Sequence, residues 1–209
     1  MSDVAYEPIE NVRPCQGAIY RDVTFILGLD IDSEDQGVNG IESFVYPYAV
    51  VLSQECDLTQ DSKARESSQV AGGESSAIDK IVPSVLLCPA YQAEKLREGT
   101  HIEEAFGVRV PRKTNPIYSQ IERNNSARFH YLSGYRPLQV PECVLDFKHF
   151  FTLPTETLVR CYGNTSHLIA RLSGAYCEEV SQRFASFLSR IGVPVPHNVL
   201  QDKRTASPE

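Results

Sequence analysis

Short runs of β-branched and aromatic residues recur through the first half of the chain, and they most constrain its fold. Three of them span residues 16–29 (QGAIYRDVTFILGL), 41–53 (IESFVYPYAVVLS) and 81–91 (IVPSVLLCPAY). Such side chains pack well on a pleated sheet, whereas a helix restricts their rotamers. Pro47 has no N–H to donate to a ladder, so it favours an edge or the start of a strand. The runs therefore predict a sheet of several short strands.

One clear helix is predicted near the C-terminal end, after two further strand-like segments at 126–132 and 142–153. Ser173 suits its N-cap, and Gly192 with Pro194 would end it. Its apolar residues recur every three or four positions and form one stripe: Tyr176, Val180, Phe184, Phe187 and Ile191. Several strands with one such helix predict an α+β fold, a small, mostly antiparallel β-barrel with a C-terminal helix.

The length of the chain favours a single domain. A chain of 209 residues fits one core, so residues 1–200 are predicted to form one barrel-plus-helix domain. Residues 60–80 are polar, serine-rich and free of aromatic side chains, which predicts a mobile loop. Residues 201–209 are predicted to be a flexible tail.

Composition and cysteine spacing narrow the class of protein. Apolar residues make up 42% and charged residues 22% of the chain, as in a soluble globular protein. No apolar run approaches the ~20 residues that cross a bilayer, and the N-terminal segment lacks the features of a signal peptide. We therefore expect a cytoplasmic protein without membrane contact. The six cysteines include no C-x-x-C pair and the five histidines no H-x-x-x-H pair, so we expect reduced thiols, no metal and no cofactor.

Charge is segregated along the chain, although the net charge is −7. Residues 1–60 contain two basic and eleven acidic residues, a balance of −9. The segment 109–136 instead holds one acidic residue and six basic ones: Arg109, Arg112, Lys113, Arg123, Arg128 and Arg136. Its four aromatic residues would complement these cations on single-stranded nucleic acid, because cations follow phosphates and rings stack on bases. The alternatives are a solvated charged loop or an internal partner for the acidic segment 30–42.

The stretch Ser53–Asp57 (SQECD) ends an apolar strand on a thiol beside carboxylates. One hypothesis makes Cys56 a nucleophile that a distant histidine, His130 or His149, activates. The alternative is that Cys56 only fills space in the core while Asp57 caps the turn. In either case Ser53, Gln54 and Asp57 are predicted to hydrogen-bond a ligand at the rim of the barrel.

The segment RFHYL, residues 128–132, alternates along a predicted strand. Alternation would place Arg128 and His130 on one face and Phe129 and Tyr131 on the other. An arginine and a histidine on one face suit a phosphate, and the histidine suits a general base. The alternative is the solvated face of an antiparallel sheet.

Two stretches resemble the PemK/MazF-like family of SH3-like barrels. QGAIY, 16–20, resembles that family's opening strand, and YPYAVVLSQ, 46–54, resembles the strand that follows its Arg-Pro pair. The family includes toxins that cut RNA without a metal, using that arginine and a hydroxyl residue. Ser53 matches the hydroxyl position. Tyr46 stands where the arginine would be, which removes the cation that stabilises the charge of the reaction.

Four further stretches resemble a group of bacterial proteins from mobile or defence-associated contexts, for which no activity is established. They are SQECD at 53–57, RFHYL at 128–132, LDF at 145–147 and RIGVP at 190–194. This resemblance implies a phage-defence or toxin–antitoxin setting.

Three hypotheses about function follow. The first is a PemK/MazF-like barrel that binds nucleic acid or a nucleotide-like ligand, with Ser53, Gln54, Asp57 and Arg128 as contacts. The second is a thiol-dependent hydrolase that uses Cys56 and His130. The third is a non-catalytic interaction module with a protein partner. Sequence alone leaves the oligomeric state open.

Overall fold

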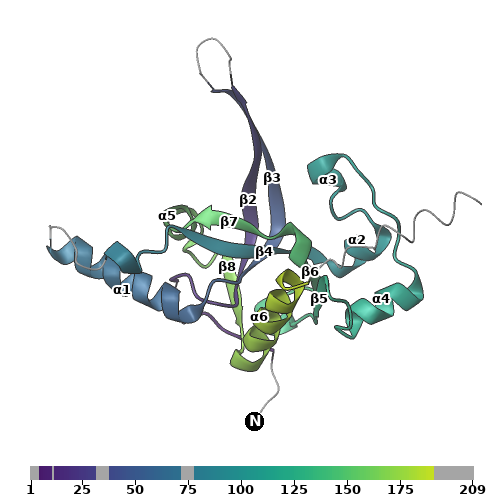
Figure 1. The fold of residues 1–209 in the computed structure, drawn as a ribbon. Helices are drawn as coiled ribbons and strands as arrows, with labels where there is room; N and C mark the ends of the chain where they lie inside the picture. The colour runs from purple at the N-terminus through teal and green to yellow at the C-terminus, as the bar shows by residue number, and fades with distance from the viewer. Residues whose placement is uncertain (1–4, 11, 32–37, 72–77, 191–209) are drawn as a thin grey trace, which may run out of the picture.

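The computed structural model describes residues 5–10, 12–31, 38–71 and 78–190. These residues form an α+β fold in which eight strands make one curled antiparallel sheet, a half-barrel (Figure 1). The order along the sheet is β1-β8-β2-β3-β4-β6-β5, and β7 pairs with β4. The strands are β1 (Tyr6–Glu7), β2 (Ala18–Ile31), β3 (Val38–Val51), β4 (Ser84–Gln92), β5 (Phe129–Leu132), β6 (Cys143–Asp146), β7 (Phe151–Pro154) and β8 (Leu168–Leu172).

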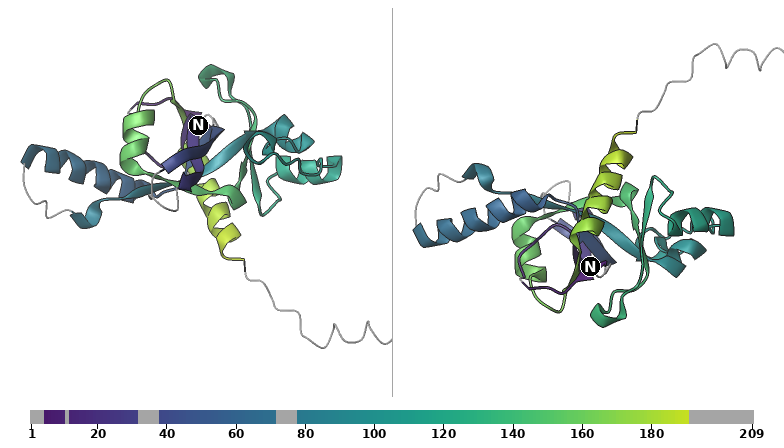
Figure 2. Two further views of the ribbon diagram at one scale, coloured as in Figure 1. Left: turned by 90° about the horizontal axis from the view of Figure 1, so that it is seen from above. Right: turned by 90° about the horizontal axis from the view of Figure 1, so that it is seen from below.

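Helices lie on both sides of this sheet. Helix α1 extends to one side, while α2, α3 and α4 lie with β5 and β6 on the other, as all three views show (Figures 1 and 2). The helical segments are α1 (Glu55–Ala71), η1 (Ile78–Lys80), α2 (Ala93–Glu98), α3 (Glu103–Phe106), α4 (Asn115–Glu122), η2 (Arg136–Leu138), η3 (Phe147–His149), α5 (Thr155–Thr157), the π-helical η4 (Leu158–Tyr162) and α6 (Gly174–Leu188).

Alternation along the strands produces two apolar cores, one on each face of the sheet. In β2, Ile19 faces one core while Ala18 and Tyr20 face the other. Helix α6 covers the Ile19 side, where Val180 and Phe184 are buried with the strand residues. This arrangement confirms the predicted fold class, a mostly antiparallel barrel-like sheet with a C-terminal helix.

Gly17 explains why a glycine opens the landmark QGAIY. Its φ is +77°, a left-handed backbone conformation that residues other than glycine rarely adopt. A Cβ atom placed there would lie 3.1 Å from both Cys177 Sγ and Leu172 Cβ. The glycine therefore lets α6 and β8 approach the start of β2.

Strands β2 and β3 extend beyond the rest of the sheet and project as a two-stranded ribbon (Figure 1). Their register runs from Ile19 opposite Val50 to Ile31 opposite Val38, with an irregularity after Ile26. In the described residues, the ladder beyond Asp22 pairs only β2 with β3, because β8 pairs with β2 as far as Tyr20.

Residues 60–71, predicted as part of a mobile loop, belong to helix α1. The helix is held by a polar anchor. Asp61 is buried and accepts hydrogen bonds from Arg65 Nε and from the backbone N–H of Val82. A polar side chain thus helps to fix helix α1, whose sequence shows no long apolar stripe. Residues 78–80 of the predicted loop form η1, while residues 72–77 and the predicted tail, 201–209, lie outside the described residues.

No helix in the described parts of the chain combines the length and apolar character needed to cross a bilayer.

Candidate functional site

The bend at Ser53–Asp57 joins β3 to α1 and ties three parts of the chain together. The backbone N–H of Leu86 donates to Ser53 Oγ at 2.8 Å, which fixes the bend to β4. Glu55 accepts hydrogen bonds from Arg13 Nη2 and from the backbone N–H of Gln16, which fixes α1 to the N-terminal segment. Ser53 and its neighbour Glu55 therefore have structural contacts.

Cys56 and Asp57 lie in the first turn of α1, and both side chains are exposed. The Cys56 thiol donates weakly to Gln54 Oε1 at 3.6 Å and to Asp57 Oδ1 at 3.5 Å. The prediction that Cys56 fills the core is wrong. No histidine contacts this thiol among the described residues, so the geometry gives it no base.

Arg128 lies just before β5 and forms a two-pronged ion pair with Asp146. Its Nε donates to Oδ1 at 2.7 Å and its Nη2 to Oδ2 at 2.5 Å. The guanidinium lies 4.8 Å from the centre of the Phe129 ring. The hydrogen bond to Asp146 raises the pKa of Arg128, although burial opposes it. The carboxylate of Asp146 thus already occupies the donors that were predicted to contact a phosphate.

His130 faces away from Arg128, into the core that α6 covers. It is 1% exposed, and its ring lies 6.3 Å from that of Phe147. Burial, reinforced by the nearby charge of Arg183, lowers the pKa of His130 to about 3, so the ring is neutral. The prediction that Arg128 and His130 share a face is wrong, because the strand begins at Phe129 and Arg128 turns onto the Phe129 ring.

The residues predicted to share a site are therefore dispersed. No contact among the described residues joins Cys56 or Asp57 to Arg128 or His130. Helix α1 leaves one side of the sheet, while β5 lies on the other side with α2 and α4 (Figures 1 and 2). The structure does not bring Cys56 and His130 together.

A different group of residues converges at a cavity of about 230 Å³, which we call the aromatic–histidine cavity. It is bordered by β3, the end of β4 and the α2–α3 segment. The residues that matter most for its chemistry are Asp22, Phe44, Pro47, Tyr91, Lys95, His101 and Glu104. Lys95 and Glu104 are exposed, whereas Tyr91 and His101 are buried.

His101 is the polar centre of this cavity. Its side chain packs edge-on against Tyr91 at 4.8 Å between ring centres, and the residue is 7% exposed. Its Nδ1 is buried and has no hydrogen-bond partner. Burial lowers the pKa of His101 to about 4, while the charge of Asp146 opposes the shift. At neutral pH the imidazole is thus uncharged, and its buried Nδ1 has no hydrogen-bond partner.

Behind the cavity, a chain of polar contacts leads to Asp146. The hydroxyl of Tyr91 is hydrogen-bonded to His149 Nδ1 at 2.9 Å, and the same nitrogen lies 3.4 Å from Asp146 Oδ2. Burial lowers the pKa of His149 and raises that of Tyr91. Asp146 is 0% exposed and also accepts from the backbone N–H of Lys148. These contacts fix the Tyr91 ring at the floor of the cavity.

Sequence reasoning missed Tyr91 and His101, and it treated His149 only as an alternative base for Cys56. Tyr91 closes a predicted strand, and His101 lies in a stretch that carries no recognisable motif. Asp146 belongs to the LDF stretch that carried the second resemblance, and this was the one signal that pointed to the site. Spacing could not reveal the rest, because the residues come from segments far apart in the chain.

No group of three or more histidine, cysteine or carboxylate side chains in the described part of the chain is placed to hold a metal ion. Comparison with known protein families, with curated proteins and with solved structures found no match to this chain. Any function must therefore be argued from the site itself.

Proposed function

We propose that the aromatic–histidine cavity binds one nucleotide unit of a single-stranded nucleic acid. The observation that carries this proposal is the union of aromatic rings, the neutral imidazole of His101 and the cation of Lys95 in the lining of one cavity of about 230 Å³. A cavity of this size suits a single base with its sugar or phosphate at the mouth.

Each part of a nucleotide has a matching group. Phe44 and Tyr91 offer ring surface for a base, and base–aromatic stacking is worth about 1–3 kcal/mol. The neutral His101 and the carboxylate of Glu104 offer hydrogen-bonding atoms for a base edge. Lys95 can follow the phosphate at the mouth. Lys113 is a second cation near His101: its Nζ lies 5.9 Å from the centre of the Phe129 ring, and its charge helps to lower the pKa of His101.

The resemblance to PemK/MazF-like barrels supports a binding site at the same place on the sheet. Pro47, the proline of the second landmark, lines the cavity. Tyr46, at the position of that family's arginine, is buried beneath it, edge-on to Phe44 at 5.0 Å between ring centres. With no cation at that position, the proposal is for binding without cleavage. Such binding fits a cytoplasmic role in phage defence or a toxin–antitoxin pair.

Fluorescence anisotropy with short labelled RNA and DNA single strands tests the proposal. The wild-type protein should bind at low salt and weaken steeply as salt rises. The double variant Lys95→Ala/Lys113→Ala should lose about tenfold in affinity and show a shallower salt dependence, by about one in the slope. Free mononucleotides should compete for the bound strand.

Lys63→Ala is the matched control, because Lys63 is an exposed lysine on α1, on the other side of the sheet. It should bind like the wild type. An absence of binding at low salt would refute the proposal, and so would an equal loss of affinity in the double variant and in the control.

A further inference from the structure

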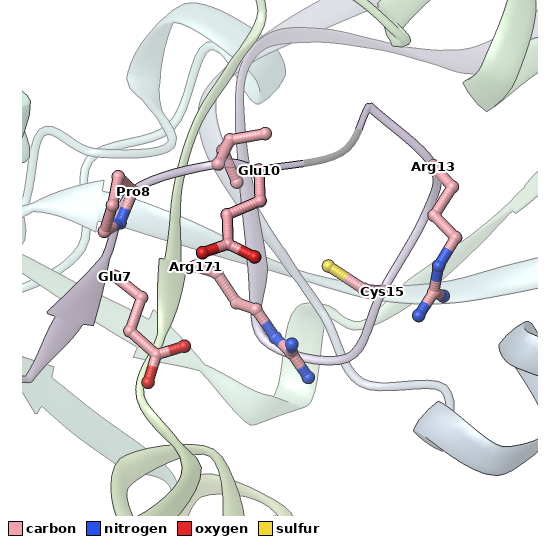
Figure 3. A pocket seen from close by; sticks show the side chains of 7 residues that line it. Glu7, Pro8, Glu10, Arg13, Cys15 and Arg171 are labelled. Atoms are coloured by element: carbon pink, nitrogen blue, oxygen red, sulfur yellow. The ribbon is translucent and has the colours of Figure 1, made fainter.

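The aromatic–histidine cavity differs in its lining from a larger cavity, of about 370 Å³, between the N-terminal segment and β8 (Figure 3). Charged side chains of both signs line the larger cavity: Glu7, Glu10, Arg13 and Arg171. None of the described residues that line it is aromatic, so it offers no ring on which a base could stack. The rings of Phe44 and Tyr91 make the aromatic–histidine cavity the better place for a base.

Hydrogen-bond acceptors predominate in the lining of the aromatic–histidine cavity. Asp22 and Glu104 supply two exposed carboxylates, and neither makes a hydrogen bond or an ion pair with the other described residues. Thr100 Oγ1 donates its hydrogen to the backbone carbonyl of Lys95 at 3.4 Å, so its oxygen is left as an acceptor. Among the described lining residues, Lys95 alone has a charged donor.

A loop with joined ends carries one of these carboxylates. Residues 99–110 include His101 and Glu104, and the backbone N–H of Val110 donates to the carbonyl of Gly99 at 3.0 Å. Gly99 has a φ of +80°, and a Cβ atom there would lie 1.9 Å from the carbonyl oxygen of Val110. The close approach of the two ends therefore requires a glycine. Because its ends are already joined, the loop loses less conformational entropy when Glu104 contacts a ligand.

The four bases differ in the donors that their Watson–Crick edges present. Guanine presents two adjacent donors, N1–H and the N2 amino group, which match the two oxygens of one carboxylate. Adenine and cytosine each present one amino group next to a ring-nitrogen acceptor, and uracil presents one N–H between two carbonyl oxygens. A carboxylate is repelled by those acceptors, because both carry negative charge. An acceptor-rich lining therefore favours guanine.

We propose that the aromatic–histidine cavity selects guanine, with the carboxylate of Glu104 accepting hydrogen bonds from N1–H and the N2 amino group. This selection rests on the proposed function, since it concerns the base of the nucleotide bound there. The carboxylate of Asp22, in the same lining, adds to the repulsion of base edges that carry acceptors. A pair of hydrogen bonds to one base edge typically favours the correct base by about tenfold or more.

Competition of free nucleotides with a labelled RNA strand of mixed sequence tests the choice of base, with fluorescence anisotropy as the readout. The probes are GMP, AMP, CMP, UMP and IMP, which lacks the N2 amino group of guanine. GMP should compete at least about tenfold better than AMP, CMP and UMP, and IMP should lie between them. Equal competition by GMP and any of the others would overturn the choice of guanine, while nucleotide binding would stand. A failure of the strand to bind at low salt would overturn both proposals.

Removal of one carboxylate separates a contact to guanine from simple repulsion of phosphate. Glu104→Gln removes a negative charge, so a carboxylate that only repels phosphate predicts tighter binding of all five nucleotides by the variant. A carboxylate that holds guanine predicts a loss of about tenfold for GMP, while AMP binds as well as before or better. Glu94→Gln, an exposed change on α2 outside the cavity lining, should leave the ratio of GMP to AMP affinity unchanged. An unchanged ratio in Glu104→Gln would overturn the assignment.

Discussion

Two carboxylates, Asp146 and Glu55, each pair with arginine, yet the two ion pairs differ in burial and in the number of partners. Asp146 is wholly buried and neutralises a single arginine, Arg128. The buried rings of Tyr91 and His101 lie in front of it, in a cavity that Lys95 and Glu104 also line. The side chain of Glu55 is 31% exposed and pairs with two arginines, Arg13 and Arg171, one on each oxygen. Burial and the number of arginines on each carboxylate thus distinguish the two ion pairs.

The largest expected effect comes from breaking the Asp146 pair. Asp146→Asn leaves Arg128 without its carboxylate, and removal of one partner of a buried pair typically costs about 3–5 kcal/mol. We expect about 3 kcal/mol, the lower end of that range, because the Arg128 side chain is 36% exposed and reaches water. Urea denaturation at neutral pH measures the change. Asp57→Asn, an exposed change of the same kind, should stay within about 0.5 kcal/mol, and a similar loss in both variants would contradict the expectation.

The next effect concerns acid stability on the Asp146 side. The folded-state pKa of His101 is about 4, below the usual value of 6.5. Between these values the unfolded chain binds a proton that the folded chain does not, so stability falls as pH falls through this window. His101→Phe keeps a ring against Tyr91 and should flatten this part of the profile by roughly 2 kcal/mol. Unfolding free energies from pH 7 to pH 4 test this, and an unchanged slope would contradict it.

The contribution of Glu55 to the unfolding free energy should change at lower pH than that of His101, and by a smaller amount. Burial alone would raise the pKa of Glu55, but hydrogen bonds from Arg13 and Gln16 outweigh it and lower the pKa below its usual 4.5. This contribution is thus present above that value and is lost only as pH falls below it. Glu55→Gln should cost about 1 kcal/mol at neutral pH, because the pair is partly exposed.

Cys56→Ala, one residue away, is the matched control for Glu55→Gln. It should change the unfolding free energy by less than about 0.5 kcal/mol, since the thiol is exposed. A larger loss from the cysteine change than from Glu55→Gln would reverse our assignment of the structural contact.

Much of the fold could be predicted from local pattern. The β-branched runs at 16–29, 41–53 and 81–91 became β2, β3 and β4, and the apolar stripe from Tyr176 to Phe187 became α6. Periodicity works there because each element buries a regular apolar face. It failed for α1, which is anchored by the buried carboxylate of Asp61, a polar residue that such patterns count as exposed.

The candidate sites were less predictable. Arg128 and the SQECD stretch were predicted to contact a ligand, and the structure gives them protein partners, Asp146, Arg13 and Arg171, from distant segments. A charged side chain next to apolar strands indicates that a partner exists, and it does not say which one. The missing hydrogen-bond partner of His101 Nδ1 can be recognised only when the burial of that atom is known.

The projecting ribbon has a consequence for how this protein responds to stress. In the described residues its outer ladder joins only β2 and β3, and an isolated two-stranded hairpin is marginally stable in water. The outer amides should therefore exchange with deuterium through local opening, whereas amides in β4 and β6 should exchange only through global unfolding. Damage confined to the ribbon would then leave the melting temperature unchanged, and only a residue-resolved measurement would detect it.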